Sequence, residues 1–302
     1  MLTYCVSCVL PDTKPDLHLD ENGVCSACRN YTDRKTVNWV EREKTLHEIL
    51  TQYKSVDGSN WDCIVPVSGG KDSTYQVVRM LQLGLKPLAV TSSTCDFSDL
   101  GRENLDNLKQ LGVDHVAMSP NPLVRAKLNG IGLKQVGDIS WPEHVSMFTI
   151  PVRAAVQFNV PLLIWGENSQ NEYGGPAEAA GSNVLNRRWL EEFGGMLGLR
   201  VSDLVGTNGI ETHHLIPYTY PSDEELKRVG VTGLFLGHYI PWDGLSNTLI
   251  AQANGMKTYE GIVEGSMVNY ENLDNYQTGI HDYFKFLKFG FGRASDLASI
   301  HI

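Results

Sequence analysis

A run of glycine, hydroxyl and charged residues between positions 68 and 74 carries groups that bind a phosphate chain. Two adjacent glycines let the backbone turn sharply and bring its N–H groups close to a ligand. Serine and threonine hydroxyls and a lysine ammonium add donors for phosphate oxygens. The run is not a Walker A loop, because the pattern Gly-x-x-x-x-Gly-Lys-Ser/Thr is absent. We predict that it binds an anion through Ser68, Gly69, Gly70, Lys71, Asp72, Ser73 and Thr74.

The elements on either side of this run would position it. A short apolar stretch at residues 62–67 precedes it, and residues 75–81 have the apolar spacing of a helix. This order predicts a strand, a tight turn and a helix N-terminus, whose unpaired N–H groups and positive dipole end attract anions. An ordinary strand–turn–helix junction with polar caps is the simpler alternative.

The order Ser-Gly-Gly-x-Asp-Ser after a strand resembles the PP-loop of the ATP pyrophosphatases. The resemblance implies that residues 68–74 hold the pyrophosphate half of ATP, and that the enzyme cleaves between the α and β phosphates. Asp72 would then lie near pyrophosphate, where a carboxylate needs Mg²⁺ to offset the repulsion.

Four cysteines near the N-terminus have the spacing of a zinc site. Cys5 and Cys8 form one Cys-x2-Cys pair, and Cys25 and Cys28 form a second pair after sixteen residues. Each pair presents two sulfurs in one direction, so two pairs complete a tetrahedron around Zn²⁺. A closed four-thiolate site has no open position, and we therefore expect a structural role. An iron–sulfur cluster and two unrelated cysteine pairs are the alternatives.

Short apolar runs separated by helical patterns predict an α/β fold. After the first strand, such runs lie at residues 88–91, 115–118, 160–165 and 234–236. We predict a doubly wound, parallel, five-stranded sheet, in which ligands bind beyond the carboxyl ends of the strands. We assign residues 1–55 to the zinc-binding module and a linker helix, 56–180 to the ATP-binding core, and 181–302 to a substrate-binding region that includes the last strand.

Two glutamates follow the fourth predicted strand. Glu167 and Glu172 lie in a polar, glycine-containing loop and could bind Mg²⁺ or a hydroxylated or amine ligand. Solvated carboxylates are the alternative. After the fifth strand, Trp242 could form a platform for a sugar ring or could close the core. We interpret His144 as a buried, hydrogen-bonded histidine.

The composition argues against some classes of function. A formal charge of -10 argues against a large nucleic-acid surface, which needs clustered lysine and arginine. No apolar run is long enough to span a bilayer, and the N-terminus lacks the basic region and apolar core of a signal peptide. We therefore expect a cytoplasmic protein without a membrane partner, and the charge disfavours nucleic acid as a partner without excluding a local basic patch.

Four stretches together resemble the N-acetyl sugar amidotransferases of bacterial surface-glycan synthesis. They are the four cysteines, residues 68–74, residues 166–175, and residues 239–243 with 279–283. The resemblance implies an enzyme of lipopolysaccharide and nonulosonic acid synthesis that uses ATP, Mg²⁺ and Zn²⁺ and binds an acetamido sugar or nucleotide sugar. A partner glutaminase would supply ammonia, and Lys71, Asp72, Glu167 and Glu172 would act in catalysis. Because the resemblance reaches Ile302 without a natural stop, we expect relatives to carry a further C-terminal portion.

Two other functions stay open. A tRNA- or nucleobase-modifying enzyme, of the thiolase or nitrile synthase type, could use the same loop, although the acidic charge counts against a tRNA substrate. A zinc module joined to an inactive nucleotide-binding domain would be an interaction protein rather than an enzyme. The intact loop counts against that second alternative.

Overall fold

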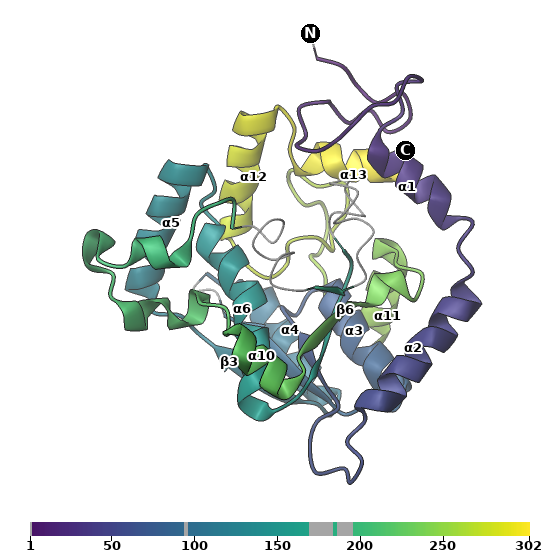
Figure 1. Ribbon diagram of the computed structural model, residues 1–302. Coiled ribbons are helices and arrows are strands. Elements are labelled where there is room, and N and C mark those ends of the chain that lie inside the picture. The colour runs from purple at the N-terminus through teal and green to yellow at the C-terminus, as the bar shows by residue number, and fades with distance from the viewer. Residues whose placement is uncertain (1, 94–95, 169–183, 186–195) are drawn as a thin grey trace.

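The computed structural model describes residues 2–93, 96–168, 184–185 and 196–302 (Figure 1). These residues form a six-stranded sheet with the strand order β3-β2-β1-β4-β6-β5. The strands are β1 (Cys63–Pro66), β2 (Pro87–Ser92), β3 (Asp114–Met118), β4 (Leu162–Trp165), β5 (Val184–Leu185) and β6 (Thr232–Phe235). Strands β1, β2, β3, β4 and β6 pair in parallel, which confirms the predicted five-stranded parallel sheet.

The sixth strand, β5, was not predicted. It pairs antiparallel with β6 at the edge of the sheet, where Val184 lies opposite Leu234. Two residues are too few to show the alternation of apolar and polar side chains by which a strand is found in a sequence.

Helices surround the sheet. They are α1 (Ser26–Arg34), α2 (Trp39–Tyr53), α3 (Lys71–Gln82), α4 (Asp99–Gln110), α5 (Pro122–Val136), α6 (Trp141–Phe158), α10 (Asp223–Val229), α11 (Gly244–Ala253), α12 (Gln277–Phe289) and α13 (Arg293–His301). Short 3-10 turns lie at η1 (Val201–Leu204), η2 (Thr207–Gly209), η3 (Thr212–Tyr218) and η4 (Leu236–His238). Within the described part of the chain, no helix has the length and apolar character needed to cross a bilayer.

The predicted linker helix is divided into two helices, α1 and α2. The side chain of Asn38 accepts a hydrogen bond from the N–H of Glu41 (3.2 Å) and caps the start of α2. Asparagine is a favoured residue at this position because its side chain satisfies an N–H group that has no partner inside the helix. The chain therefore restarts a helix at residue 39.

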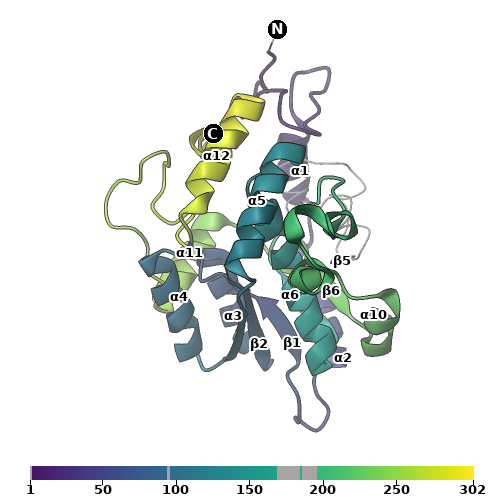
Figure 2. The ribbon, with the colours of Figure 1, turned by 90° about the vertical axis from the view of Figure 1, so that its left-hand side faces the viewer.

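Alternate strand residues pack on opposite faces of the sheet. Val65 of β1 faces Met80 of α3 and Leu108 of α4, whereas its neighbour Ile64 faces Ile150 of α6. Figure 2 shows α3 and α4 on one side of the strands and α6 on the other. All of these side chains are almost fully buried, and each contributes about 1.5–3 kcal/mol through removal of apolar surface from water. The result is the three-layered, doubly wound arrangement that the sequence predicts.

The strand order reverses between β1 and β4. Strand β1 pairs with β2 on one side and with β4 on the other, so the chain winds in opposite directions from this point. In open parallel sheets such a reversal leaves a crevice at the carboxyl ends of the two strands, which is where ligands bind. Residues 68–74 follow β1 and therefore lie at this crevice.

The N-terminal residues and the C-terminal helices lie side by side (Figure 1). Cys5, Cys8 and Cys25 form a small buried cluster with Leu10, Leu17 and Phe291, and the half-buried Cys28 packs against it. The hydroxyl of Thr13 also donates a hydrogen bond to the carbonyl of Phe289. The cysteine module is thus covered by residues from the far end of the sequence.

Candidate functional site at the carboxyl edge of the sheet

The turn after β1 depends on two glycines with different tasks. Gly69 has φ of +87°, and a Cβ atom there would lie 3.0 Å from the backbone nitrogen of Leu105 and 3.2 Å from the carbonyl oxygen of Gly101. Only glycine combines this conformation with such a close approach to α4. Gly70 occupies the N-cap of α3, and no side chain caps this helix. The first N–H groups of α3 have no partner within the helix and are available to a ligand.

The hydroxyl groups of this turn have divided roles. The Ser73 hydroxyl accepts hydrogen bonds from the N–H groups of Ser68 (3.3 Å) and Gly69 (3.2 Å), and it donates to the carbonyl of Gly70 (3.1 Å). The Ser68 hydroxyl accepts from the N–H of Gly70 (3.4 Å). Thr74 is fully buried, and its hydroxyl has no hydrogen-bond partner in the described structure. Ser73 therefore shapes the turn, and the N–H groups of α3 and the O–H of Ser68 are donors left for an anion.

Lys71 lies between two carboxylates. Its Nζ atom is 2.8 Å from Asp72 Oδ2 and 2.7 Å from Glu271 Oε1, and Asp72 Oδ1 accepts a hydrogen bond from Asn247 of α11 (2.9 Å). Burial opposes the charged form, but the two carboxylates outweigh burial and raise the pKa of Lys71 above its ordinary value. Lys71 is therefore held as a cation next to the N-terminus of α3.

A pocket of about 130 Å³ opens at this point. One wall is the turn and the other is a segment from the C-terminal third of the chain. The pocket is lined by Ser68, Gly70, Lys71, Asp72, Ser73, Tyr270, Glu271, Asn272, Leu273 and Asp274. The second wall is fixed to the start of α4, since the Ser98 hydroxyl donates to the carbonyl of Leu273 and the Ser98 N–H donates to that of Asp274 (2.9 Å).

A larger cavity of about 400 Å³ lies at the opposite edge of the sheet. Its lining includes Trp61, Lys86 and Asp114, which stand where β1, β2 and β3 begin. The amino ends of parallel strands are not the edge at which doubly wound folds bind ligands. We therefore place the candidate site at the smaller pocket, where the turn, the helix N-terminus and the charged groups meet.

Glu167 and Glu172 follow β4 in sequence. Gly166 lies against α3, where the Gln76 amide, oriented to satisfy both partners, accepts from the Gly166 N–H (3.1 Å) and donates to the carbonyl of Ile164 (3.3 Å). Glu167 stands beside Gly237 at the end of β6 and does not line the pocket at α3. Glu172 lies outside the described residues, so its predicted role stays a prediction.

The aromatic residues after β6 are largely committed to packing. Tyr239 is buried in the core, and Trp242 packs edge-on against Tyr75 with ring centroids 5.4 Å apart. This supports the core alternative for Trp242 over the sugar platform. The neighbouring Asp243 caps α11, the helix that brings Asn247 to Asp72.

The four predicted zinc ligands converge. The Sγ atoms of Cys5 and Cys28 are 3.9 Å apart, those of Cys8 and Cys25 are 3.6 Å apart, and all four lie within 4.8 Å of one another. Tetrahedral Zn–S bonds of about 2.3 Å place two sulfurs about 3.8 Å apart, so the arrangement fits zinc. Burial opposes ionisation of Cys5, but backbone N–H groups outweigh burial and lower its pKa to about 6. This cluster could hold Zn²⁺.

Glu271 and Asn247 were not found by sequence reasoning. Glu271 lies in an irregular segment between α11 and α12, where no periodic pattern or motif marks it. Asn247 follows Asp243 in a helix whose contact with α3 arises only in the folded chain. The pattern of residues 68–74 predicted one wall of the pocket. No local sequence pattern predicted the other wall.

The residues of the pocket fit a polyphosphate accompanied by a cation. The uncapped helix N-terminus and Lys71 suit phosphate oxygens, whereas Asp72 and Glu271 would repel them. Carboxylate oxygens are ligands that Mg²⁺ prefers, and Mg²⁺ commonly bridges one or two carboxylates to substrate phosphates. The donor set is therefore coherent for phosphate together with Mg²⁺.

Comparison with known proteins gives remote structural likenesses. No family model and no curated protein matches this sequence. The structure is similar to that of NMN synthetase from Francisella tularensis, with a TM-score of 0.33 and 14% identity over 76% of this chain and 99% of that chain. It is also similar to a predicted subunit of tRNA methyltransferase from Methanocaldococcus jannaschii, with a TM-score of 0.33 and 12% identity over 78% of this chain and 90% of that one. At this distance neither protein indicates what this chain binds.

Proposed function

We propose that this protein is an ATP-dependent enzyme that releases AMP and pyrophosphate. The observation that carries the proposal is the uncapped N-terminus of α3, set behind the Gly69–Gly70 turn at the reversal of strand order. The N–H groups of that helix and Lys71 would bind the pyrophosphate portion of ATP. Asp72 and Glu271 would hold Mg²⁺, which offsets the negative charge that develops on the departing pyrophosphate.

Within this class we propose an amidotransferase that converts the acetamido group of a bacterial sugar into an acetamidino group. An amide carbon is a poor electrophile, and its oxygen is a very poor leaving group. When the amide oxygen attacks the α-phosphorus, pyrophosphate leaves and an O-adenylyl imidate forms. Ammonia then adds to the imidate carbon, and AMP departs with the oxygen. The resemblance of residues 166–175, 239–243 and 279–283 to the sugar amidotransferases supports this substrate class.

A separate glutaminase is the proposed source of ammonia. This chain would then make product with ammonium salts alone, but with glutamine only when the partner is present. Chemistry at the amide requires no nucleophilic thiol. Accordingly, Cys63 is fully buried in the core, and burial raises the pKa of its thiol.

The test is to incubate the protein with ATP, Mg²⁺, ammonium and a panel of acetamido sugars, and to analyse the mixture by mass spectrometry. We expect AMP together with a product lighter than its sugar by the difference between an oxygen atom and an NH group. Asp72→Asn should abolish both signals, whereas Asp106→Asn, at an exposed carboxylate on α4, should leave them unchanged. AMP formation that requires tRNA or a free base, and no sugar, would instead establish the nucleic-acid-modifying alternative.

A further inference from the structure

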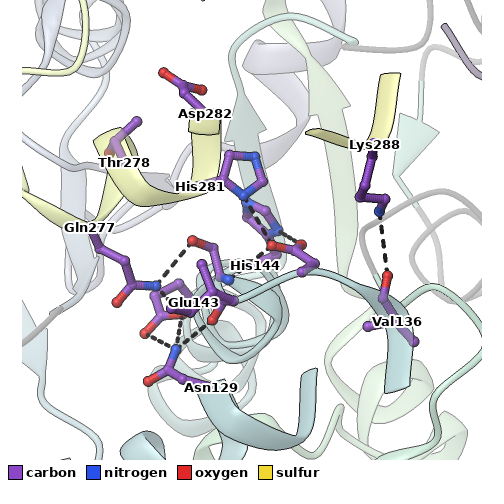
Figure 3. Close-up of polar contacts among 12 residues, drawn as sticks. Asn129, Val136, Glu143, His144, Gln277, Thr278, His281, Asp282 and Lys288 are labelled. Atoms are coloured by element: carbon purple, nitrogen blue, oxygen red, sulfur yellow. Dashed lines mark hydrogen bonds and ion pairs between the residues drawn. The ribbon is translucent and has the colours of Figure 1, made fainter. Parts of the chain in front are cut away.

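Three side chains of types that bind metals, two of them six residues apart and the third from the C-terminal part of the sequence, meet beyond the carboxyl edge of the sheet. Asp138 follows α5. His144 lies in α6 and His281 lies in α12 (Figure 3). The Nδ1 atom of His144 is 3.1 Å from Asp138 Oδ2, and that of His281 is 3.0 Å from Asp138 Oδ1. The two rings stand nearly perpendicular, with centroids 5.3 Å apart. Candidate ligand atoms of the three residues lie within 4.8 Å of one another.

The elements that carry these side chains are fastened together. Gln277, at the start of α12, donates hydrogen bonds to the Ser140 hydroxyl (3.0 Å) and to Glu143 (2.9 Å). The N–H of Ser140 donates to Asp138 Oδ1 (2.9 Å), which fixes the carboxylate. Arg125 pairs with Glu143 (3.2 Å) and with Asp96 (2.8 Å), so the charge of Glu143 is partly offset by a cation that it shares with Asp96. Outer contacts of this kind hold ligands in place before a metal arrives.

Burial and charge favour a cation between these groups. The Asp138 side chain is 8% exposed, and with both imidazoles neutral the cluster carries one negative charge. A buried carboxylate without a cation is costly even when it accepts hydrogen bonds. The side chains of His144 and His281 are 34% and 30% exposed, so an ion can reach them and would keep some of its positions open to water. His144 is thus hydrogen-bonded as the sequence predicted, but it is only partly buried.

We propose that Asp138, His144 and His281 bind a divalent transition-metal ion. Ligand bonds of about 2.1 Å place neighbouring donors about 3.0 Å apart at right angles and about 3.4 Å apart in a tetrahedron, close to the nitrogen–oxygen distances found here. Two imidazoles and one carboxylate suit Zn²⁺, Fe²⁺ or Mn²⁺ and disfavour Mg²⁺, which prefers oxygen ligands. Three protein ligands leave open positions, as in catalytic metal sites and unlike the closed cysteine cluster.

The site is distinct from the two sites described above. Its nitrogen ligands separate it from the Mg²⁺ expected at Asp72 and Glu271, and its lack of thiolates separates it from the cysteine cluster. It lies at the same carboxyl edge of the sheet as the phosphate pocket. Ser146, two residues beyond His144 in α6, accepts a hydrogen bond from Ser92, the last residue of β2 (2.9 Å). The proposal does not depend on the reaction proposed for the pocket.

The test is a metal titration of the full chain with Zn²⁺ already in the cysteine cluster. We expect a further equivalent of Co²⁺ to bind with weak visible absorption and without the strong thiolate-to-metal charge-transfer bands. His144→Asn and His281→Asn should each abolish this equivalent. The matched control is His213→Asn. His213 stacks on His214 beside Glu211, and these exposed residues form the kind of cluster that collects ions adventitiously. The control should bind Co²⁺ as the wild type does.

Three results would overturn the proposal. The wild-type protein could bind no further equivalent of Co²⁺, both cluster variants could still bind that equivalent, or the His213 variant could lose it. Because a variant could lose its fold, the wild-type protein is also treated with diethyl pyrocarbonate and the modified histidines are mapped by mass spectrometry. Co²⁺ should protect His144 and His281 but not the exposed His47. Equal modification of all three histidines with and without Co²⁺ would contradict the site independently of any substitution.

Discussion

At the scale of single residues, the central feature is one lysine shared by two carboxylates. Lys71 carries one positive charge, and Asp72 and Glu271 carry two negative charges, so the group as a whole is negative. A polyphosphate would meet repulsion there unless a cation came with it. The same two carboxylates hold Lys71 in a single orientation, which places its charge beside the N-terminus of α3.

Replacing Lys71 with methionine should therefore affect both stability and activity. Two partly buried carboxylates would be left without their cation, and we expect a loss of about 1–3 kcal/mol in the free energy of unfolding. The folded-state pKa of Lys71 lies above its ordinary value of about 10.4, so its stabilising effect is fully present below that pH. The loss should stay constant between pH 6 and pH 9 and should shrink only as the pH rises through the folded-state pKa.

Urea unfolding at several pH values measures this loss. The control is Lys109→Met, because Lys109 and Asp106 are 52% and 68% exposed and form an ion pair on the surface of α4. Exposed pairs of this kind contribute little. Equal losses in the free energy of unfolding of the two variants would show that Lys71 stabilises the protein no more than an exposed lysine does.

At the scale of elements, the conformation of the phosphate turn depends on how closely the turn after β1 approaches α4. Gly69→Ala would place a methyl group 3.0 Å from the backbone of Leu105 in addition to forcing a positive φ. Gly112 has nearly the same φ, +85° against +87°, but a Cβ atom there meets nothing within 4 Å. The pair of substitutions therefore separates crowding from conformational strain.

We expect Gly112→Ala to cost about 1 kcal/mol from conformation alone, and Gly69→Ala to cost more and to abolish ATP binding. Thermal unfolding and calorimetric titration with ATP measure the two effects. If both variants bound ATP as the wild type does, the turn would not be the nucleotide site.

The elements also show how much of this structure could be predicted from the sequence. Short apolar runs marked all five parallel strands, including β3, which is exposed or half-buried at the edge of the sheet. Gly69 marked the turn because its neighbours carried phosphate-binding groups. Strand β5 was missed because two residues show no pattern. Glu271 was missed because it pairs with Lys71 only in the folded chain, where its segment is bonded to the start of α4. No local sequence rule relates residues two hundred positions apart. The cluster of Asp138, His144 and His281 was missed because His281 joins the other two residues only in the folded chain.

At the scale of the whole molecule, the cysteine cluster joins the two ends of the sequence. Its apolar cover is Phe291, and Thr13 bonds to the backbone of Phe289. Zinc at the four thiolates would therefore order the C-terminal helices as well as the N-terminal module. Small metal-bound modules have little core of their own, so their folding depends on the ion.

Removal of zinc by a chelator should loosen both ends together. Hydrogen exchange monitored by mass spectrometry should speed up in residues 2–28 and in α12 and α13, while β1, β2 and β4 stay protected. Cys5→Ser should give the same pattern without a chelator. Faster exchange confined to the N-terminal residues would show that the C-terminal helices are held independently of the metal.

This joining of the ends has a consequence for synthesis on the ribosome. The residues bonded through Thr13 and Phe289 are 276 positions apart, so at about 5–20 residues per second the cysteine module emerges roughly 14–55 seconds before its cover. Throughout that interval its thiols and apolar side chains face the solvent, open to oxidation and to neighbouring nascent chains. Early capture of zinc would protect the thiols during this wait, and emergence of Phe289 and Phe291 would then cover the module.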